Sequence, residues 1–140
     1  MGYPVVVYVY PERNEAFRNI VTTVPPKKGN QAAVRFLMLF TWKAAAKEVE
    51  DWIEKSGGTE AHMRKKFSRA VQPPIPDNNQ GMEKVSYRAY MDEHNQDHSE
   101  FLEYLQALPS GRAKQVFLQT AMVRSYEAAE RIVKLITIAD

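Results

Sequence analysis

Hydrophobic and polar residues alternate in one segment of the chain as a half-buried β-strand requires. In KVSYRAYM, residues 84–91, polarity changes with a period of two, which matches the alternation of strand side chains between two faces. One face would carry Val85, Tyr87, Ala89 and Met91, and the other would carry Lys84, Ser86, Arg88 and Tyr90. The apolar run VVVYVY, residues 5–10, predicts a second strand near the N-terminus.

A stripe of apolar residues with helical spacing lies in the last third of the chain. Its members recur at alternating intervals of four and three residues, as on one face of a long α-helix. They are Leu118, Met122, Tyr126, Ala129, Val133 and Ile136. A shorter helix is expected before Pro109, with Asp97 or Ser99 as its N-cap. Its apolar positions are Phe101, Leu102, Leu105 and Leu108.

The first half of the chain shows the same order of elements. When Pro25 is laid on Pro109 without gaps, a second apolar stripe falls on the first. Its members are Val34, Met38, Trp42, Ala45, Val49 and Trp52. The segment NEAFRNIVTTV predicts the short helix, and a long helix is expected from Gln31 to about Trp52. We interpret the two halves as copies of one unit, made of a strand, a short helix, a turn and a long helix.

Segments rich in glycine and proline divide these units. SGG follows the first unit, and QPPIPDNNQG precedes the second unit. These segments mark boundaries because they cannot continue a helix or a strand. The expected organisation is a first unit over residues 1–55, a linker over residues 56–83 and a second unit over residues 84–140. Within the linker, TEAHMRKKFSRAV is expected to form a short basic helix that begins at Thr59.

A lone strand leaves its hydrogen-bonding edge open, and one strand with two helices cannot bury its apolar face alone. Both problems are solved if the two strands pair antiparallel and the helices interlock beneath them. The expected fold class is therefore mainly α with a short two-stranded antiparallel ribbon, built from tandem units in one chain.

Composition narrows the function classes. The chain of 140 residues has no cysteine, which excludes disulfides, thiolate metal sites and cysteine nucleophiles. It has no apolar run of membrane-spanning length, and its N-terminus lacks the features of a signal peptide, so we expect a cytoplasmic protein with no membrane contact. The sequence shows no glycine-rich phosphate loop, nucleophile elbow or carboxylate pair, so we expect neither an enzyme nor a cofactor.

Charge is nearly balanced overall and uneven in its distribution. The net charge is +2, but basic residues gather in PPKKG, HMRKKFSRA and SGRAK, while acids gather in KEVEDWIEK and MDEHNQDHSE. A basic face can exist inside such a total, and a solvated surface of mixed charge is the alternative.

The segment MDEHNQDHSEFLEYLQALPSGRAKQVFLQTAMVRSY combines a strand that ends in an acidic turn, a short helix that ends in Leu-Pro-x-Gly-Arg, and a long helix. This order resembles the ribbon-helix-helix family of DNA-binding proteins, of the Arc and MetJ type. The second half, roughly residues 84–130, is most similar to plasmid partition adaptors of the ParR type. The tandem plan resembles conjugative-transfer proteins of the TraY type, and the first half resembles the family only through its match to the second.

The resemblance implies binding of double-stranded DNA, with the ribbon in the major groove. The outward side chains that would read base edges are Lys84, Ser86 and Arg88. The N-terminus of each long helix would bind a backbone phosphate. The matching positions are Ser110, Gly111 and Arg112, with Lys27, Lys28 and Gly29 as their first-unit equivalents. Arg64, Lys65, Lys66 and Arg69 either add phosphate contacts or form a solvated helix face.

The family also suggests a biological setting. It points to a plasmid or another mobile element, with a role in partition or stability, or in repression of an operon. An accessory role in the relaxosome of conjugative transfer is the alternative. Self-association on repeated DNA sites would fit such a protein, and the sequence names no protein partner.

Three features depart from the family. The first strand is expected to present Val5, Val7 and Val9 where the family has polar readers, so this half of the ribbon would read little sequence or would pair with a partner. The chain ends in LITIAD, without the tail by which ParR-type adaptors engage a filament. The charge is low for a tight DNA binder, which predicts a shallow salt dependence.

Two other interpretations concern the same residues. The valine-rich strand offers an edge for pairing with another chain, so a protein-interaction module is the second function class. His94 and His98 have the four-residue spacing of helical zinc ligands. No third ligand is evident, and the turn before the helix is expected to separate the two histidines, so we expect no metal.

Overall fold

The computed structural model describes residues 2–12, 14–56, 83–108 and 111–137. Two strands, β1 (Gly2–Val9) and β2 (Val85–Asp92), pair antiparallel as a ribbon. The helices are α1 (Glu15–Thr23), α2 (Gln31–Leu39), α3 (Trp42–Ser56), α5 (Gln96–Ala107) and α6 (Gly111–Ile136), and the 3-10 turn η1 (Lys28–Asn30) precedes α2. A mainly helical fold with a short two-stranded antiparallel ribbon is thus confirmed. The predicted linker helix that begins at Thr59 lies outside the described residues.

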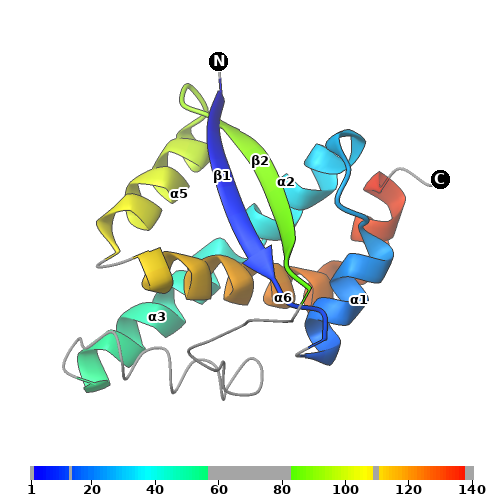
Figure 1. Cartoon of the computed structure of the whole chain (residues 1–140). Coiled ribbons are helices and arrows are strands. Elements are labelled where there is room, and N and C mark those ends of the chain that lie inside the picture. The colour runs from blue at the N-terminus through cyan, green and yellow to red at the C-terminus, as the bar shows by residue number, and fades with distance from the viewer. Residues whose placement is uncertain (1, 13, 57–82, 109–110, 138–140) are drawn as a thin grey trace.

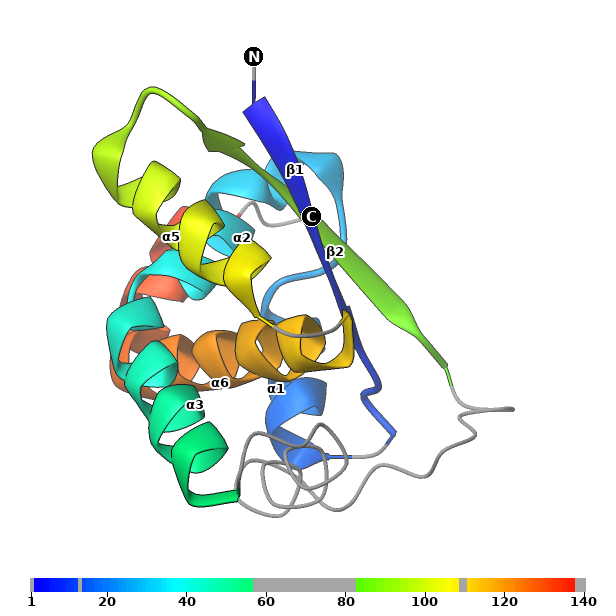
Figure 2. The same cartoon turned by 90° about the vertical axis from the view of Figure 1, so that its left-hand side faces the viewer.

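The helices lie together on one side of the ribbon. Figure 1 shows the ribbon in front of them, and the view turned by 90° shows that the other face of the ribbon is open (Figure 2). Behind the ribbon α2 packs against α6, α2 contacts β2, and α6 contacts β1. Each half of the chain therefore supplies a helix that covers the strand of the other half, and the two halves share one core.

The ribbon buries every second residue of each strand. On β2 the buried residues are Val85, Tyr87, Ala89 and Met91, as the alternating pattern predicts. On β1 the buried residues are Val5, Val7 and Val9, so the expectation that these valines face outward is wrong. The register pairs Val7 with Tyr87 and Val5 with Ala89, so that buried positions of the two strands lie opposite one another.

The reason for this error lies in the sequence VVVYVY. Its residues are apolar at odd and even positions alike, so the alternation that identifies the buried face of β2 is absent from β1. The helices behind the ribbon decide which face is covered. As a result Pro4, Val6 and Tyr8 form the outward face of β1.

The core contains the apolar positions of both halves. Phe17, Ile20 and Leu37 of the first half are fully buried with Phe101 and Phe117 of the second. Of the two predicted stripes, Val34, Met38, Ala45, Leu118, Met122, Ala129 and Val133 are buried. Trp42, Tyr126 and Ile136 are half-buried against the core, and the side chains of Val49 and Trp52 are outside the described part of the chain.

The predicted first long helix is divided in two. α2 ends at Leu39 and α3 begins at Trp42, although the apolar stripe continues through both helices. At the break, the backbone N–H of Thr41 donates to Ser125 Oγ at 3.3 Å, and the two side-chain hydroxyls are 3.1 Å apart. Ser125 is fully buried in α6, so a contact between the halves stabilises the break. α6 also departs from helical geometry, at Ala129, with φ −141° and ψ 41°.

Asparagine side chains cap both short helices. Asn14 Oδ1 accepts from the backbone N–H groups of Ala16 and Phe17 at the start of α1. Asn95 plays the same role for α5, so the expectation that Asp97 or Ser99 caps this helix is wrong. Within the described residues no helix is both long enough and apolar enough to cross a membrane.

Candidate nucleic-acid interface

The outward face of the ribbon, called the open face below, carries the three residues predicted to read bases. Ser86 and Arg88 are exposed on β2, and Lys84 directly precedes that strand. Across the ribbon, Ser86 pairs with Tyr8 and Arg88 pairs with Val6. The outward residues of the two strands are Gly2, Pro4, Val6, Tyr8, Ser86, Arg88, Tyr90 and Asp92, and Lys84 directly precedes β2. The open face therefore combines hydrogen-bonding side chains from β2 with apolar and aromatic side chains from β1.

One of these side chains is held across the ribbon by an aromatic ring. Lys84 Nζ lies 4.6 Å from the centroid of the Tyr8 ring. A cation over a half-buried aromatic face gains about 0.5–1 kcal/mol. The Tyr8 ring therefore restrains the ammonium group of Lys84 beside β1.

A hollow of about 330 Å³ adjoins the open face on the side of β2, and we call it the basic hollow. Ser86 and Arg88 line it from the ribbon, and Lys27, Lys28 and Gln31 line it from the start of α2. The described residues of its lining include three basic side chains and no acidic one. Two groups of residues that the sequence assigned separately to bases and to phosphates thus meet at one surface.

The loop that carries the two lysines is fixed to the ribbon. The Tyr87 hydroxyl donates to the Val24 carbonyl at 2.6 Å, and burial raises the pKa of Tyr87 far above its usual range. Asn30 is fully buried, and its Nδ2 donates to the Pro25 carbonyl at 2.9 Å. The backbone N–H of Asn30 donates to the Lys27 carbonyl at 3.1 Å. These bonds hold Lys27 and Lys28 beside β2, with both lysines exposed.

The outer edge of β1 is occupied by two glutamines of α6. Gln115 accepts from the Tyr8 backbone N–H at 2.9 Å and donates to the Val6 carbonyl at 3.0 Å. Gln119 Nε2 donates to the Tyr8 carbonyl at 2.6 Å. The first turns of α6 therefore lie against β1, where they provide partners for the Val6 carbonyl and for the N–H and carbonyl of Tyr8.

Arg35 of α2 makes the corresponding contact with β2. Its Nε donates to the Tyr90 carbonyl at 3.0 Å. The sequence analysis assigned no role to Arg35, Gln115 or Gln119. One sequence feature could have pointed to these ribbon contacts. When Pro25 is laid on Pro109, Arg35 aligns with Gln119, so a long polar side chain occupies the same position in both halves.

The remaining predicted phosphate positions lie at the starts of the two helices. Gly29 is exposed within η1. Gly111 begins α6 and is exposed, with open space where a Cβ atom would lie. Ser110 and the side chain of Arg112 lie outside the described residues, as do the four basic residues Arg64, Lys65, Lys66 and Arg69.

The two histidines belong to the turn between β2 and α5. His98 Nδ1 accepts from the Asp92 backbone N–H at 2.9 Å, and the His94 backbone N–H donates to Asp92 Oδ1 at 2.9 Å. His98 lies in the first turn of α5, and His94 precedes that helix. In the described part of the chain, no three histidine or acidic side chains lie close enough to hold a metal ion.

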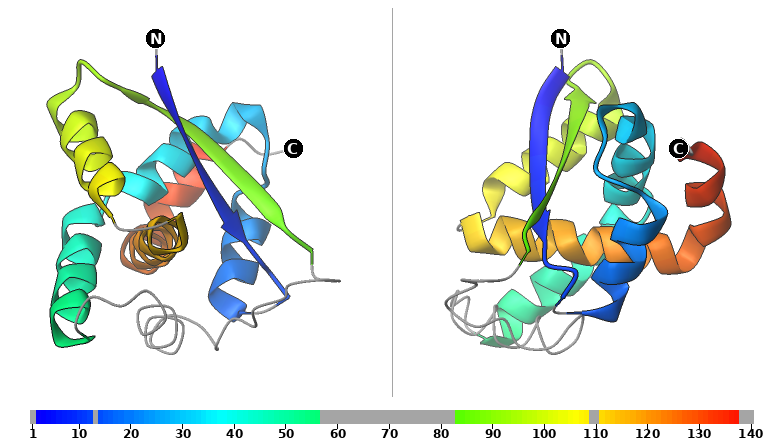
Figure 3. Two further views of the ribbon diagram at one scale, coloured as in Figure 1. Left: turned by 60° about the vertical axis from the view of Figure 1, so that its left-hand side comes forward. Right: turned by 45° about the vertical axis from the view of Figure 1, so that its right-hand side comes forward.

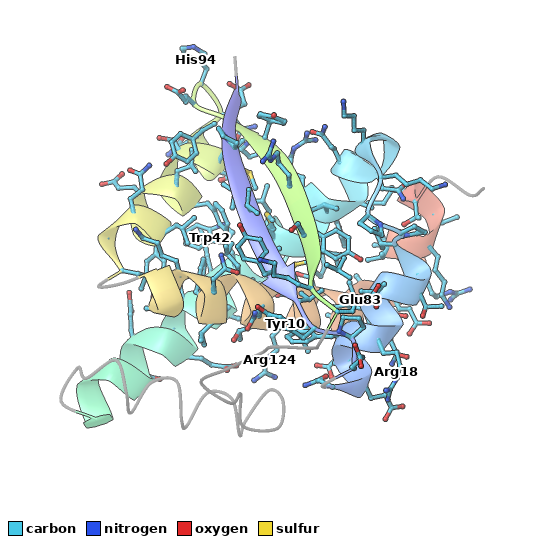
Figure 4. All side chains as sticks on the ribbon, viewed as in Figure 1. Tyr10, Arg18, Trp42, Glu83, His94 and Arg124 are labelled. Carbon is cyan, nitrogen blue, oxygen red and sulfur yellow. The ribbon has the colours of Figure 1, made fainter. Side chains whose placement is uncertain are left out.

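The two ends of the ribbon differ in their surroundings. Figure 4 shows Glu83 and Tyr10 near one end and His94 beyond the other. The backbone N–H of Glu83 donates to Glu12 Oε1 at 2.8 Å, which closes the first end. We refer to these as the Glu83 end and the His94 end.

Comparison with known proteins adds no further identification. No protein-family model, no curated protein and no solved structure matches the chain.

Proposed function

We propose that this protein is a tandem ribbon-helix-helix protein that binds double-stranded DNA sequence-specifically, with the open face of the ribbon in the major groove. The observation that carries the proposal is the meeting of Ser86 and Arg88 with Lys27 and Lys28 around the basic hollow. The major groove is wide enough for a two-stranded ribbon. Arg88 would donate two hydrogen bonds to a guanine, Ser86 would contact an adjacent base, and Lys84 would reach a guanine or a phosphate.

Phosphate binding is proposed at the starts of α2 and α6. The helix dipole favours an anion at such positions. Lys27 and Lys28 add positive charge at the start of α2, next to the ribbon. Gly111 leaves space for a phosphate to approach the backbone at the start of α6.

Several paired features support the tandem relation between the halves. Asn14 and Asn95 cap the two short helices. The carbonyls of Tyr8 and Tyr90 each accept from a long-helix side chain, and these two donors, Gln119 and Arg35, occupy aligned positions. The connection from strand to short helix is five residues (10–14) in the first half and three residues (93–95) in the second. The short helices also differ in length, with nine residues in α1 and twelve in α5, so the gapless alignment of Pro25 with Pro109 does not extend back to the helix caps and the strands.

The contacts of β1 favour DNA binding over assembly through the valine-rich strand. Val5, Val7 and Val9 are buried in the core. The outer edge of β1 at Val6 and Tyr8 is already hydrogen bonded to α6. A partner strand would have to displace these contacts before it could pair with β1.

The proposed biological role rests on the family resemblance alone. We propose a cytoplasmic protein of a plasmid or another mobile element, acting in partition or stability or in repression of an operon. Accessory function in a relaxosome remains the second candidate role. The readout that separates these roles is the position of the DNA site, in a partition locus, in a promoter or beside an origin of transfer.

The test is selection of preferred sites from a random DNA duplex pool, followed by binding of the Arg88→Ala variant to the selected site and to a scrambled duplex. We expect Arg88→Ala to weaken binding to the selected site by about 1–3 kcal/mol and to leave binding to the scrambled duplex nearly unchanged. Arg131→Ala is the matched control, because Arg131 is exposed in α6, and the C-terminal turns of that helix lie away from the ribbon (Figure 3). An unchanged affinity of Arg88→Ala for the selected site would contradict the proposed reading surface.

A further inference from the structure

The side chains on the open face are not related by the two-fold symmetry that a ribbon of two equivalent strands would have. A two-fold axis through the pair Val6–Arg88 exchanges the ends of the ribbon and places Tyr8 on Tyr90. The same axis places Ser86 on Pro4. Only the two tyrosines are exchanged with an identical residue. Ser86 is exchanged with a proline, and Arg88 is exchanged with a valine.

The consequence is a gradient of hydrogen-bonding capacity along the ribbon. Lys84 and Ser86 lie toward the Glu83 end, and Arg88 lies at the centre. Toward the His94 end the outward residues are Pro4 and Tyr90, both exposed, followed by Asp92 at the end of β2. The Asp92 carboxylate cannot donate a hydrogen bond and accepts one from the His94 backbone N–H. Pro4 can contact a thymine methyl group but cannot donate a hydrogen bond to a base.

The two long edges of the ribbon also differ in shape. On the β1 side, Gln115 closes the space between α6 and the strand with hydrogen bonds to Val6 and Tyr8. On the β2 side, the aligned residue Gln31 lines the basic hollow. Lys27 and Lys28 therefore place positive charge along the β2 edge of the ribbon.

We propose that the ribbon recognises a duplex site without two-fold symmetry. The half-site under the Glu83 end and the centre is read through base acceptors, above all guanine O6 and N7, by Lys84, Ser86 and Arg88. The half-site under the His94 end is read through thymine methyl groups and groove shape by Pro4 and Tyr90. This inference rests on the proposed DNA-binding function and specifies the class of site that the ribbon takes.

The first experiment compares the selected site with two palindromes, each built by duplicating one of its halves in inverted orientation. We expect both palindromes to bind the full-length protein roughly 10-fold more weakly than the selected site, because each places one half-site under side chains that cannot read it. A palindrome that binds as tightly as the selected site would overturn the inference.

The second experiment assigns the halves to residues by changing single atoms of the DNA. Replacing guanine by 7-deazaguanine removes the N7 acceptor, and replacing thymine by deoxyuracil removes only the methyl group. We expect 7-deazaguanine to weaken binding about 5-fold or more in one half and the centre of the site, and deoxyuracil to weaken it about 3-fold in the other half. Lys84→Ala should reduce the weakening caused by 7-deazaguanine and leave the weakening caused by deoxyuracil unchanged. Pro4→Ala is the matched variant at the opposite end of the ribbon.

The outcomes separate the inference from the proposed function. A selected motif with inverted repeats and equal effects of both analogues in its two halves would overturn the asymmetric reading and leave DNA recognition intact. A pool that yields no motif, with weak binding that disappears as salt is raised, would overturn the proposed function and the inference together.

Discussion

Two tyrosines donate hydrogen bonds to backbone carbonyls of other elements. Tyr87 donates to the Val24 carbonyl and thereby attaches the loop before α2 to the ribbon. Tyr104 donates to the Ala46 carbonyl at 2.9 Å, which attaches α5 to α3. Burial, with a smaller contribution from the Glu50 carboxylate, raises the pKa of Tyr104 to about 12. Both hydroxyls are therefore more strongly protonated in the folded protein than in the unfolded chain.

This difference predicts a loss of stability at high pH. In the unfolded chain Tyr104 ionises near pH 10, whereas in the folded protein its pKa is about 12. The stabilising contribution is complete below about pH 10 and falls as the pH rises from about 10 to about 12, because only the unfolded state then releases the proton. Urea denaturation at a series of pH values should show that Tyr104→Phe reduces the steepness of this fall. Parallel curves for the variant and the parent protein would show that Tyr104 does not contribute to it.

At the residue scale, the sequence pattern correctly predicted which residues of β2 face outward, but it did not predict which residues of β1 do so. Lys84, Ser86 and Arg88 could be placed because they alternate with large apolar residues. The valines of β1 could not be placed, since both faces of that strand are apolar. Arg35 and Gln115 could not be recognised as ribbon contacts either, because their partners are backbone groups distant in the sequence, which leave no pattern of side chains.

At the level of elements, the helices complete the ribbon as well as cover it. Gln115 and Gln119 form hydrogen bonds with Val6 and Tyr8 on the outer edge of β1, and Arg35 contacts the outer edge of β2. A two-stranded ribbon is marginal alone, so these side chains contribute order that the strands lack. The geometry of the open face therefore depends on residues that do not lie on it.

Removing one of these contacts should loosen one strand selectively. We expect Gln115→Ala to lower the free energy of unfolding by about 1–3 kcal/mol, because the Tyr8 N–H and the Val6 carbonyl lose their partner. Amide hydrogen exchange should show faster exchange at Tyr8 than in the parent protein. Amides of β1 that face β2 provide the internal control, and equal acceleration of both sets would indicate general destabilisation in place of a local role.

The break between α2 and α3 illustrates where sequence patterns stop being informative about elements. The apolar stripe continues from Met38 to Trp42 and Ala45 without interruption, so its spacing predicts one long helix. The break coincides with hydrogen bonds from Thr41 to Ser125, a residue of the other half. Arg124 forms an ion pair with Glu48 next to this junction and further joins α6 to α3. The spacing of apolar residues within one half does not predict contacts with the other half.

For the whole molecule, the distribution of charge matters more than its sum. The net charge is +2, yet the described lining of the basic hollow contains Lys27, Lys28 and Arg88 without an acidic side chain. If the two lysines each neutralise a phosphate, binding should depend on salt through a small and countable number of contacts.

This gives a prediction for the salt dependence. We expect Lys27→Ala and Lys28→Ala each to reduce the slope of log affinity against log salt concentration by about 0.9, and to weaken binding to all sequences alike. Titrations at several salt concentrations with the selected and scrambled duplexes would measure both effects. Arg131→Ala should leave the slope unchanged. A change in sequence preference, with no change in slope, would instead assign the lysines to base contacts.

The pairing of β1 with β2, two strands far apart in the sequence, also affects how the chain folds. The ribosome makes β1 first, but the strand that pairs with it and the helix that covers it emerge much later. Until then VVVYVY is an apolar, uncharged segment with an unpaired edge, which is the kind of segment that associates with other chains. Closing the ribbon also requires contacts between residues distant in sequence, which slows folding relative to a helical bundle of local contacts. The same interlocking that gives one core to two halves thus leaves β1, which is made before its partners, as one of the last segments to be protected.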